Sequence, residues 1–315
     1  MNSVRSAPGG RRILRQRPRT HSVDETGDPG SPPQVRSDFD FVSPNQTKSP
    51  KNPIRGHWKH GYPPSSMRVA LFITCLMDQF RASAAEATVE VLERCGCEVV
   101  FDPRQTCCGQ PAFNAGQHDA AIPVCRTAIR ILEEQLQGGC EAIVVPSGSC
   151  AAMFRHAIGL LDGEDAEAAT RVVDASYELS AFLVNRLDRV DVDAGWTGRV
   201  AWHDACHGLR ELGIDSEPRR LLRAVRGLEL VESATCDRCC GFGGTFSVNL
   251  PGISVGMADD KIDELETLGI DAVVSGDTSC LMQLEGRLAA RGSTIRGVHL
   301  AEILASREHT PGSES

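Results

Sequence analysis

Eight cysteines of this chain fall into two groups with the same order and nearly the same spacing. Each group has one cysteine, then an adjacent pair followed by glycine, then a further cysteine. The single cysteine and the pair are separated by 31 residues in the first group and 32 in the second, and the pair and the last cysteine by 41 and 39. We call these groups the first nest (Cys75, Cys107, Cys108, Cys150) and the second nest (Cys206, Cys239, Cys240, Cys280). The agreement indicates an internal duplication.

Four thiolates brought together would bind a soft metal centre. Thiolates select iron–sulfur clusters, zinc or copper, and a set of four suits either a [4Fe–4S] cluster or a zinc ion. Structural zinc sites commonly use two close CxxC pairs, which these groups lack, and the side chains of adjacent cysteines diverge. We therefore predict metal or cluster ligation at all eight positions, and the spacing favours an iron–sulfur cluster over zinc. Thiol redox chemistry and packing are the other interpretations.

Not every cysteine belongs to this pattern. The chain has thirteen cysteines, and Cys95, Cys97, Cys125 and Cys140 have no counterpart in the other half. A cysteine without a chemical partner is usually a small buried hydrophobic residue. We expect these four to be packing residues.

The second nest has polar neighbours that the first lacks. His203, Asp204 and His207 surround Cys206 in WHDACHGLR, whereas the matching stretch of the first half reads FITCLMD. A histidine here could take a hydroxyl proton as general base, and Arg210 could pair with a carboxylate. His203, His207 and Arg210 are therefore candidate catalytic residues. Packing of the histidines, helix capping by Asp204 and simple solvation of Arg210 are the alternatives.

Strand-like and helix-like segments alternate along both halves. Residues 142–145 and 272–275 are short β-branched runs typical of buried parallel strands, and residues 83–94, 120–136 and 257–268 have the composition of helices. This alternation predicts an α/β fold of two duplicated parallel-sheet halves, related by pseudo-twofold symmetry and each with one nest. Loops at the carboxyl ends of parallel strands converge, so the cysteines of each nest can meet.

Composition separates the N-terminal stretch from the rest. Residues 1–66 hold ten of the seventeen prolines and carry a charge of about +6, while the remainder carries about −15. We expect a disordered extension or a misassigned translation start, because Met67 directly precedes a strand. An organelle transit peptide is disfavoured by the prolines and glycines. The expected divisions are an extension at 1–66, a first repeat at 67–160, a helical connection at 161–198, a second repeat at 199–305 and a disordered tail at 306–315.

Bulk properties exclude some classes of function. The net charge of −9 argues against nucleic acid as a partner. The longest apolar run, residues 69–77, is too short to cross a bilayer. Many cysteines without an export signal suit a reducing compartment, so we expect a cytoplasmic protein that uses them for metal or redox chemistry.

The repeated cysteine pattern resembles the cysteine-rich CCG domain, which also occurs in heterodisulfide reductase and in the iron–sulfur subunit of glycolate oxidase. VALFITCLMD, QTCCGQPAFNAG, VVPSGSCAAMF, HDACHGLR, CCGFGGTFSV and GDTSCLM further resemble the lactate utilisation protein A family, over residues 67–305. The resemblance implies an iron–sulfur oxidoreductase subunit that converts L-lactate to pyruvate. It also implies two partner subunits, one of them ferredoxin-like. The alternatives are a zinc-bound assembly subunit of the same complex and a cytoplasmic thiol–disulfide protein.

The chain departs from the heterodisulfide reductase relatives at one position in each half. Those relatives end each motif with CxxC, whereas Ser147 and Asp277 stand here in place of the first cysteine of that pair. Each nest then has four candidate ligands instead of five, which disfavours the non-cubane cluster of the relatives. Four alternatives remain. They are an ordinary cubane cluster, a cluster with Asp277 as an oxygen ligand, zinc in one nest, and an iron with an open position for a 2-hydroxy acid.

Overall fold

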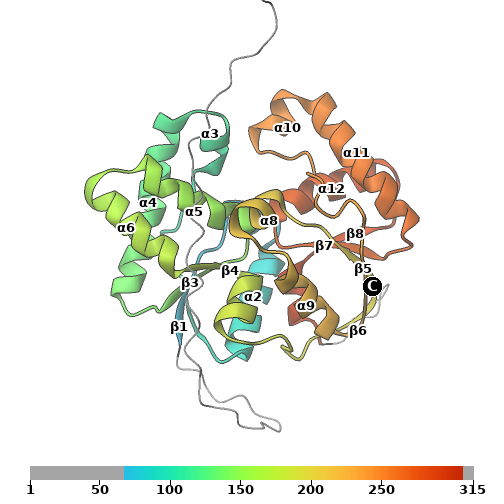
Figure 1. The fold of residues 1–315 in the computed structure, drawn as a ribbon, viewed down its shortest axis with the longest axis horizontal. Coiled ribbons are helices and arrows are strands. Elements are labelled where there is room, and N and C mark those ends of the chain that lie inside the picture. Colours follow the sequence, from blue (N-terminus) through green and yellow to red (C-terminus); the bar gives the residue numbers. More distant parts are fainter. Residues whose placement is uncertain (1–66, 308–315) are drawn as a thin grey trace, which may run out of the picture. The chain divides into compact units, whose positions relative to one another are not determined.

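The computed structural model describes residues 67–307 of the 315-residue chain. The expectations for residues 1–66 and 308–315 lie outside the described residues. Two four-stranded sheets form the framework, with strand orders β2-β1-β3-β4 and β6-β5-β7-β8, and every pair of neighbouring strands is parallel (Figure 1). The same strand order in both sheets confirms the predicted duplicated α/β halves.

The first sheet and the helices around it are formed by the N-terminal half of the described chain. Its strands are β1 (Arg68–Leu71), β2 (Glu98–Val100), β3 (Ala142–Val145) and β4 (Ser176–Glu178). Its helices are α1 (Cys75–Phe80), α2 (Ala82–Arg94), α3 (Gln110–Asn114), α4 (His118–Gln137), α5 (Gly148–Leu160), α6 (Gly163–Ala175), α7 (Leu179–Ala181) and the π-helix η1 (Phe182–Arg186).

The second half repeats this arrangement. Its strands are β5 (Gly195–Trp202), β6 (Arg226–Val231), β7 (Ala272–Ser275) and β8 (Arg296–His299). Its helices are α8 (Cys206–Leu212), α9 (Ser216–Ala224), α10 (Thr245–Asn249), α11 (Pro251–Thr267), α12 (Thr278–Ala290) and α13 (Leu300–Ala305). Among residues 67–307, no helix is long and apolar enough to cross a membrane.

The β-branched runs form the most buried strands, as their composition predicts. β3 and β7 have the expected bounds, and all their residues are buried. The expected helices also form, as α2, α4 and α11, with ends that differ by up to six residues from the predicted ones. The largest difference is at the start of α11, where Pro251 occupies the first helical position. Proline suits that position because its missing N–H would have no partner inside the helix.

Alternate residues of the central strands face different cores. Val69 of β1 and Val200 of β5 belong to one core that both halves share. Ala70 packs instead into a core of the first half, and Ala201 into a core of the second half. This period of two follows from strand geometry. The shared core holds the two sheets in one arrangement, which fixes the loops at their carboxyl ends relative to each other.

The segment expected as a helical connection also contributes a strand. Residues 161–198 include α6, α7 and η1, but β4 lies between them and completes the first sheet beside β3. β4 followed by α7 corresponds to β8 followed by α13, and Glu178 and His299 are the N-caps of these two helices. We therefore propose that the first repeat continues beyond residue 160, through η1. The missing cysteine in this segment concealed the correspondence.

Candidate metal centre

All eight cysteines of the two nests line a single cavity of about 270 Å³. We call it the nest cavity. In each half the single cysteine begins the helix after the central strand, and the last cysteine lies in the first turn of the helix after the neighbouring strand. The adjacent pair lies in the loop before α3 or α10. These two helices lie at the same end of the molecule, one from each half (Figure 1), and both contribute lining residues. The cysteines of each nest therefore lie close together, as the sequence predicts.

The first nest is held close by the turn at its CCG triplet. Cys108 Sγ lies 3.2 Å from Cys150 Sγ, and the backbone N–H of Gly109 donates to Cys107 Sγ at 3.4 Å. Gly109 has φ +93°, and a Cβ on it would approach Ala121 O to 3.2 Å. Glycine is therefore required both by the backbone angle and by the lack of space.

The second nest repeats this geometry. The backbone N–H of Gly241 donates to Cys239 Sγ at 3.4 Å. Gly241 has φ +86°, and a Cβ here would lie only 2.5 Å from Ser254 O. Both CCG glycines thus allow a left-handed turn that aims a backbone donor at a sulfur atom.

One thiol of each nest is strongly acidified by the neighbouring thiols. Hydrogen bonds from Cys108 and Cys75 lower the pKa of Cys107 to about 3. The corresponding bonds from Cys206 and Cys240 lower the pKa of Cys239 to about 2. Two thiols thus favour the thiolate form of a third in each nest by hydrogen bonding.

The last cysteine of each nest sits at a helix N-terminus. Cys150 is the third residue of α5 and Cys280 the third residue of α12, and both helices are 13 residues long. The N-terminal end of a helix carries a partial positive charge, which favours a thiolate or an anionic cluster nearby. Ser147 and Asp277 cap these helices by accepting hydrogen bonds from backbone N–H groups of the first turn.

Asp277 is buried, and both of its oxygens are engaged. Oδ1 accepts from the backbone N–H and the hydroxyl of Ser279, at 3.1 and 2.5 Å. Oδ2 accepts from Ser147 Oγ at 3.1 Å and from the backbone N–H of Ser149 at 3.0 Å, both in the other half. Asp277 also lines the nest cavity. A metal could use this carboxylate only by displacing some of these bonds, so its role as a ligand stays a prediction.

The three candidate catalytic residues lie in different environments. His207 lines the nest cavity, with Nδ1 3.5 Å from Cys206 Sγ and Nε2 3.6 Å from Glu211 Oε1. Arg210 is exposed, is not among the lining residues, and its guanidinium reaches only the backbone oxygen of Asp237, at 3.5 Å. His203 is buried beneath the second nest and does not line the cavity. Of the three, only His207 is placed to meet a molecule in the cavity.

His203 lies close to two cysteines of the second nest. One of its ring nitrogens and the sulfur atoms of Cys240 and Cys280 lie within 4.8 Å of one another. The side chain is 1% exposed, and neither ring nitrogen has a hydrogen-bond partner among the described residues. Burial, with a smaller contribution from Lys261, lowers the pKa of His203 to about 3, so the imidazole is neutral. A neutral imidazole with an unpartnered nitrogen is a potential metal ligand.

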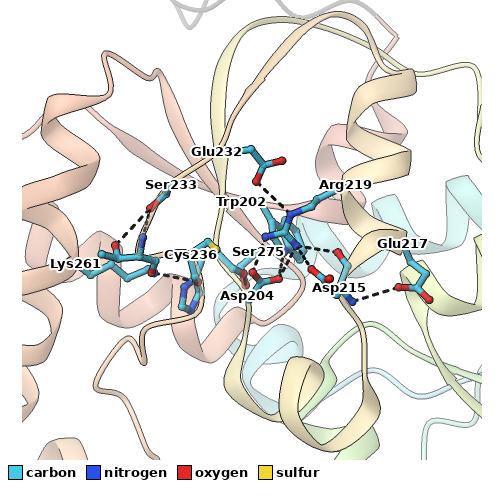
Figure 2. Close-up of polar contacts among 12 residues, drawn as sticks. Trp202, Asp204, Asp215, Glu217, Arg219, Glu232, Ser233, Cys236, Lys261 and Ser275 are labelled. Carbon is cyan, nitrogen blue, oxygen red and sulfur yellow. Dashed lines mark hydrogen bonds and ion pairs between the residues drawn. The ribbon is translucent and has the colours of Figure 1, made fainter.

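Asp204 positions the loop that leads to the second nest and does not cap α8, whose N-cap is Ala205. Figure 2 shows Arg219 reaching Asp204 and Glu232. Arg219 binds both oxygens of Asp204, at 3.0 and 2.7 Å, and Trp202 Nε1 donates to Oδ1 at 2.6 Å. The backbone N–H of Asp204 also donates to Cys236 O at 3.0 Å. The buried ion pair thus fixes the end of β5 against the loop that carries the CCG triplet.

Two residues near the second nest were not singled out from the sequence. Lys261 is fully buried, and its Nζ donates to the backbone oxygens of Thr235 and Cys236, at 2.5 and 3.2 Å (Figure 2). Cys236 is half-buried, and burial together with the nearby charge of Asp204 raises the pKa of its thiol. The sequence does contain a signal for Lys261. It is a lysine on the apolar face of α11, at a place where the first half has Ile129 at the same distance after its CCG triplet.

The four cysteines expected as packing residues are all buried. Cys95 and Cys97 belong to the core that both halves share, and Cys125 and Cys140 belong to the core of the first half. None of the four lines the nest cavity.

Comparisons with known proteins agree with the duplicated geometry. Residues 69–155 and 200–285 each match the family model described as CCG, a cysteine-rich domain. Lactate utilization protein A of Geobacillus sp. (strain WCH70) is 44% identical over 243 residues, which are 76% of this chain and 100% of that protein. Lactate utilization protein A of Bacillus subtilis (strain 168) is 43% identical over 244 residues, again 76% of this chain and 100% of that protein.

Proposed function

Because the chain belongs to the lactate utilization protein A family and carries the cysteine-rich CCG domain twice, we propose that it is the iron–sulfur subunit of a system that oxidises L-lactate to pyruvate. The observation that carries this proposal is that both cysteine nests line one cavity. An iron–sulfur cluster, when bound, supplies one-electron transfer. Two such centres facing one cavity would be close enough to exchange electrons directly.

The donor set fits a cluster in each nest. Each nest offers four thiols, one of them with a pKa lowered by hydrogen bonds from its neighbours, and a backbone N–H aimed at that sulfur. Such N–H groups can hydrogen-bond to cluster sulfur as well. A zinc ion bonds sulfur at about 2.3 Å and would fill only the space between its four ligands. A cavity of about 270 Å³ shared by the nests leaves room for something larger, and we therefore favour [4Fe–4S] clusters.

His207 is the residue that this proposal assigns to the lactate hydroxyl. Oxidation of the hydroxyl to a ketone removes two electrons and two protons, and a base must take the hydroxyl proton. His207 lines the nest cavity beside Cys206. Glu211 lies between the rings of His207 and His156, with an oxygen 2.8 Å from His156 Nε2. A carboxylate in this position can hold the imidazole in place and stabilise it once it is protonated.

The substrate carboxylate has no cationic partner in this part of the chain. Among the described residues, no lysine or arginine lines the nest cavity, and Arg210 points elsewhere. We therefore propose that this chain serves mainly in electron transfer and that the carboxylate is bound with help from a partner protein. The family resemblance suggests two such partners, one of them ferredoxin-like, and we place the complex in the cytoplasm because reducing conditions keep its thiols available.

One contact favours a second candidate function, thiol–disulfide chemistry. Cys108 Sγ and Cys150 Sγ are 3.2 Å apart, so a small movement would bring them to the roughly 2.05 Å of a disulfide bond. This function would need the two thiols to stay free of metal. Metal content therefore separates it from the leading proposal.

The test is reduction of the intact complex by its substrate. The complex, purified without oxygen and mixed with L-lactate but no other electron acceptor, should lose visible absorbance and form pyruvate. Cys108→Ser and Cys240→Ser should abolish both changes, while Cys95→Ser, a buried cysteine outside the nests, should leave them intact. Lactate turnover that persists at the wild-type rate in both nest variants would remove this chain from the electron path.

A further inference from the structure

We propose that an imidazole nitrogen of His203 is a ligand of the metal centre in the second nest, so that the two nests hold chemically unequal centres. The inference rests on the proposed function in one respect, namely that a metal centre is present. It assigns His203 a different role from the catalytic one expected from the sequence. The role follows from burial, position and the comparison of the two halves.

Within residues 67–307, the ring of His203 has no hydrogen-bond partner. The side chain is 1% exposed, and Nδ1 and Nε2 are both buried without a hydrogen bond. Burying a polar group without a partner is unfavourable, because the group loses its hydrogen bonds to water. A bond from one nitrogen to a metal would remove much of that cost. The other buried imidazole, His299, differs because its Nδ1 accepts from the backbone N–H of Ala301 at 3.1 Å.

The position of the ring suits a metal bond. A nitrogen of His203 and the sulfur atoms of Cys240 and Cys280 lie within 4.8 Å of one another. Metal–nitrogen bonds of about 2.0–2.1 Å and metal–sulfur bonds of about 2.3 Å would require only a modest contraction of this group. The backbone of His203 is fixed, because its N–H donates to Val274 O at 2.8 Å and its carbonyl accepts from Ser275 Oγ at 3.2 Å. The ring is therefore held in place before any metal arrives.

In the part of the chain that the structure describes, the first nest has no histidine in this position. In the alignment of the two halves, Phe72 takes the place of His203, at the same distance before the first cysteine of its nest. Phe72 is fully buried and packs edge-on against Phe154, with ring centroids 5.0 Å apart. The first nest therefore offers thiolates alone, and the second nest offers thiolates and an imidazole.

This difference in ligands predicts different reduction potentials for the centres of the two nests. Where the neutral imidazole of His203 replaces one of the four thiolates of the second nest as a ligand, the iron–sulfur centre carries less negative charge and its reduction potential is higher. The surroundings of the two nests differ as well, because the buried Lys261 donates hydrogen bonds near the second nest, whereas the matching position of the first half holds Ile129. Within this chain, electrons would accordingly come to rest at the second nest.

The test uses the full chain loaded with iron and sulfide without oxygen, in a Cys108→Ser background that disables the first nest. The reduced centre is examined by pulsed electron paramagnetic resonance, with histidines labelled by ¹⁵N or left unlabelled. We expect a strong coupling to nitrogen that changes with the histidine label. It should disappear in His203→Phe, which copies the first half, and persist in His207→Phe. The reduction potential should also fall in His203→Phe.

The outcomes distinguish this inference from the proposed function. Full iron and sulfide content with no histidine-dependent coupling overturns the ligand role of His203 and leaves the proposed function standing. Failure to bind iron and sulfide overturns both. The label comparison in the chain that retains His203 gives an answer even if His203→Phe does not fold. A coupling that survives unchanged in a folded His203→Phe protein also contradicts the inference.

Discussion

Ser147 and Asp277 occupy equivalent positions in the two halves and bind each other, with Ser147 Oγ donating to Asp277 Oδ2 at 3.1 Å. Each residue is the N-cap of the helix that carries the last cysteine of its nest. The contact therefore ties the two nests together at their helix N-termini. Two aspartates would repel each other here, whereas one hydroxyl donor and one carboxylate acceptor are complementary.

Loss of this tie should weaken the fold. Asp277→Ala would leave buried donors of Ser147, Ser149 and Ser279 without their acceptor. We expect the free energy of unfolding of the metal-free protein to fall by roughly 3 kcal/mol, measured by urea titration. The exposed Asp237→Ala should change it by less than about 0.5 kcal/mol. Unchanged stability in Asp277→Ala would show that the contact does not hold the halves together.

The same variant also tests Asp277 as a metal ligand. If Asp277 is only a tie, the folded variant should still bind iron and sulfide and support lactate turnover. If Asp277 is a metal ligand, the folded variant should bind less metal. If an open iron position beside Asp277 meets the substrate, turnover should fall even in the folded variant. Intact lactate turnover would remove support for the open iron position.

Close approach of the halves at Gly148 should make that position intolerant of a side chain. A Cβ on Gly148 would lie 2.9 Å from the Cα of Gly208 in α8, where only backbone could give way. We expect Gly148→Ala to destabilise the protein by about 1–3 kcal/mol. Gly159→Ala in the same helix meets nothing within 4 Å and should be neutral or stabilising by up to about 1 kcal/mol. Equal effects of the two substitutions on the thermal midpoint would contradict the close packing.

Stability should fall with rising pH because of Glu178. Burial raises the pKa of this carboxyl from 4.5 to about 7, although Ser180 and Ala181 donate hydrogen bonds to it. The folded state then holds a proton that the unfolded chain releases between these pH values. The stabilisation that the protonated Glu178 contributes to the folded state is complete below pH 4.5 and is lost as the pH rises through about 7. The loss is about 3 kcal/mol.

Glu178→Gln isolates this contribution, because glutamine does not titrate. The free energy of unfolding of both proteins is measured from pH 4.5 to 8. As the pH rises, the native protein should lose stability relative to Glu178→Gln. A difference that is constant with pH would show that the buried carboxyl keeps its ordinary pKa.

Two thiols should react first when no metal is bound. The pKa of Cys107 is lowered to about 3 and that of Cys239 to about 2, both by thiol hydrogen bonds. Burial instead raises the pKa of Cys95 to about 11. At pH 5, iodoacetamide should therefore modify Cys107 and Cys239 before Cys95, as followed by mass spectrometry. Metal loading should protect both. Equal rates at all three cysteines would refute the proposed thiolates.

The alternation of strand-like and helix-like segments is sufficient to predict the fold class, and the duplicated cysteine spacing adds the convergence of each nest. The positions that follow parallel strands, such as Cys75 and Cys206, converge because of sheet geometry alone. The matching bounds of β3 and β7 show that a run of β-branched residues is a strong signal for a buried strand. These features depend on local pattern and chain order, which a sequence contains directly.

Features that depend on contact between the halves could not be predicted in the same way. The spacing gave no sign that Gly148 would meet Gly208, or that Ser147 would bind Asp277. The catalytic candidates show the same limit. His203 and His207 are four residues apart in the chain, yet one is buried beneath the nest and the other lines the cavity. Local sequence cannot show which side of a strand–helix turn faces a cavity that two halves form together.

The most direct test of the account is the metal and sulfide content of the chain purified without oxygen, with zinc measured in the same sample. We predict iron and sulfide at about four each per nest, thus about eight each per chain. Cys108→Ser and Cys240→Ser should each lose about half, and the double variant nearly all, while Cys95→Ser keeps the full content. Zinc without sulfide, even after reconstitution with iron and sulfide, would contradict the account and favour an assembly role.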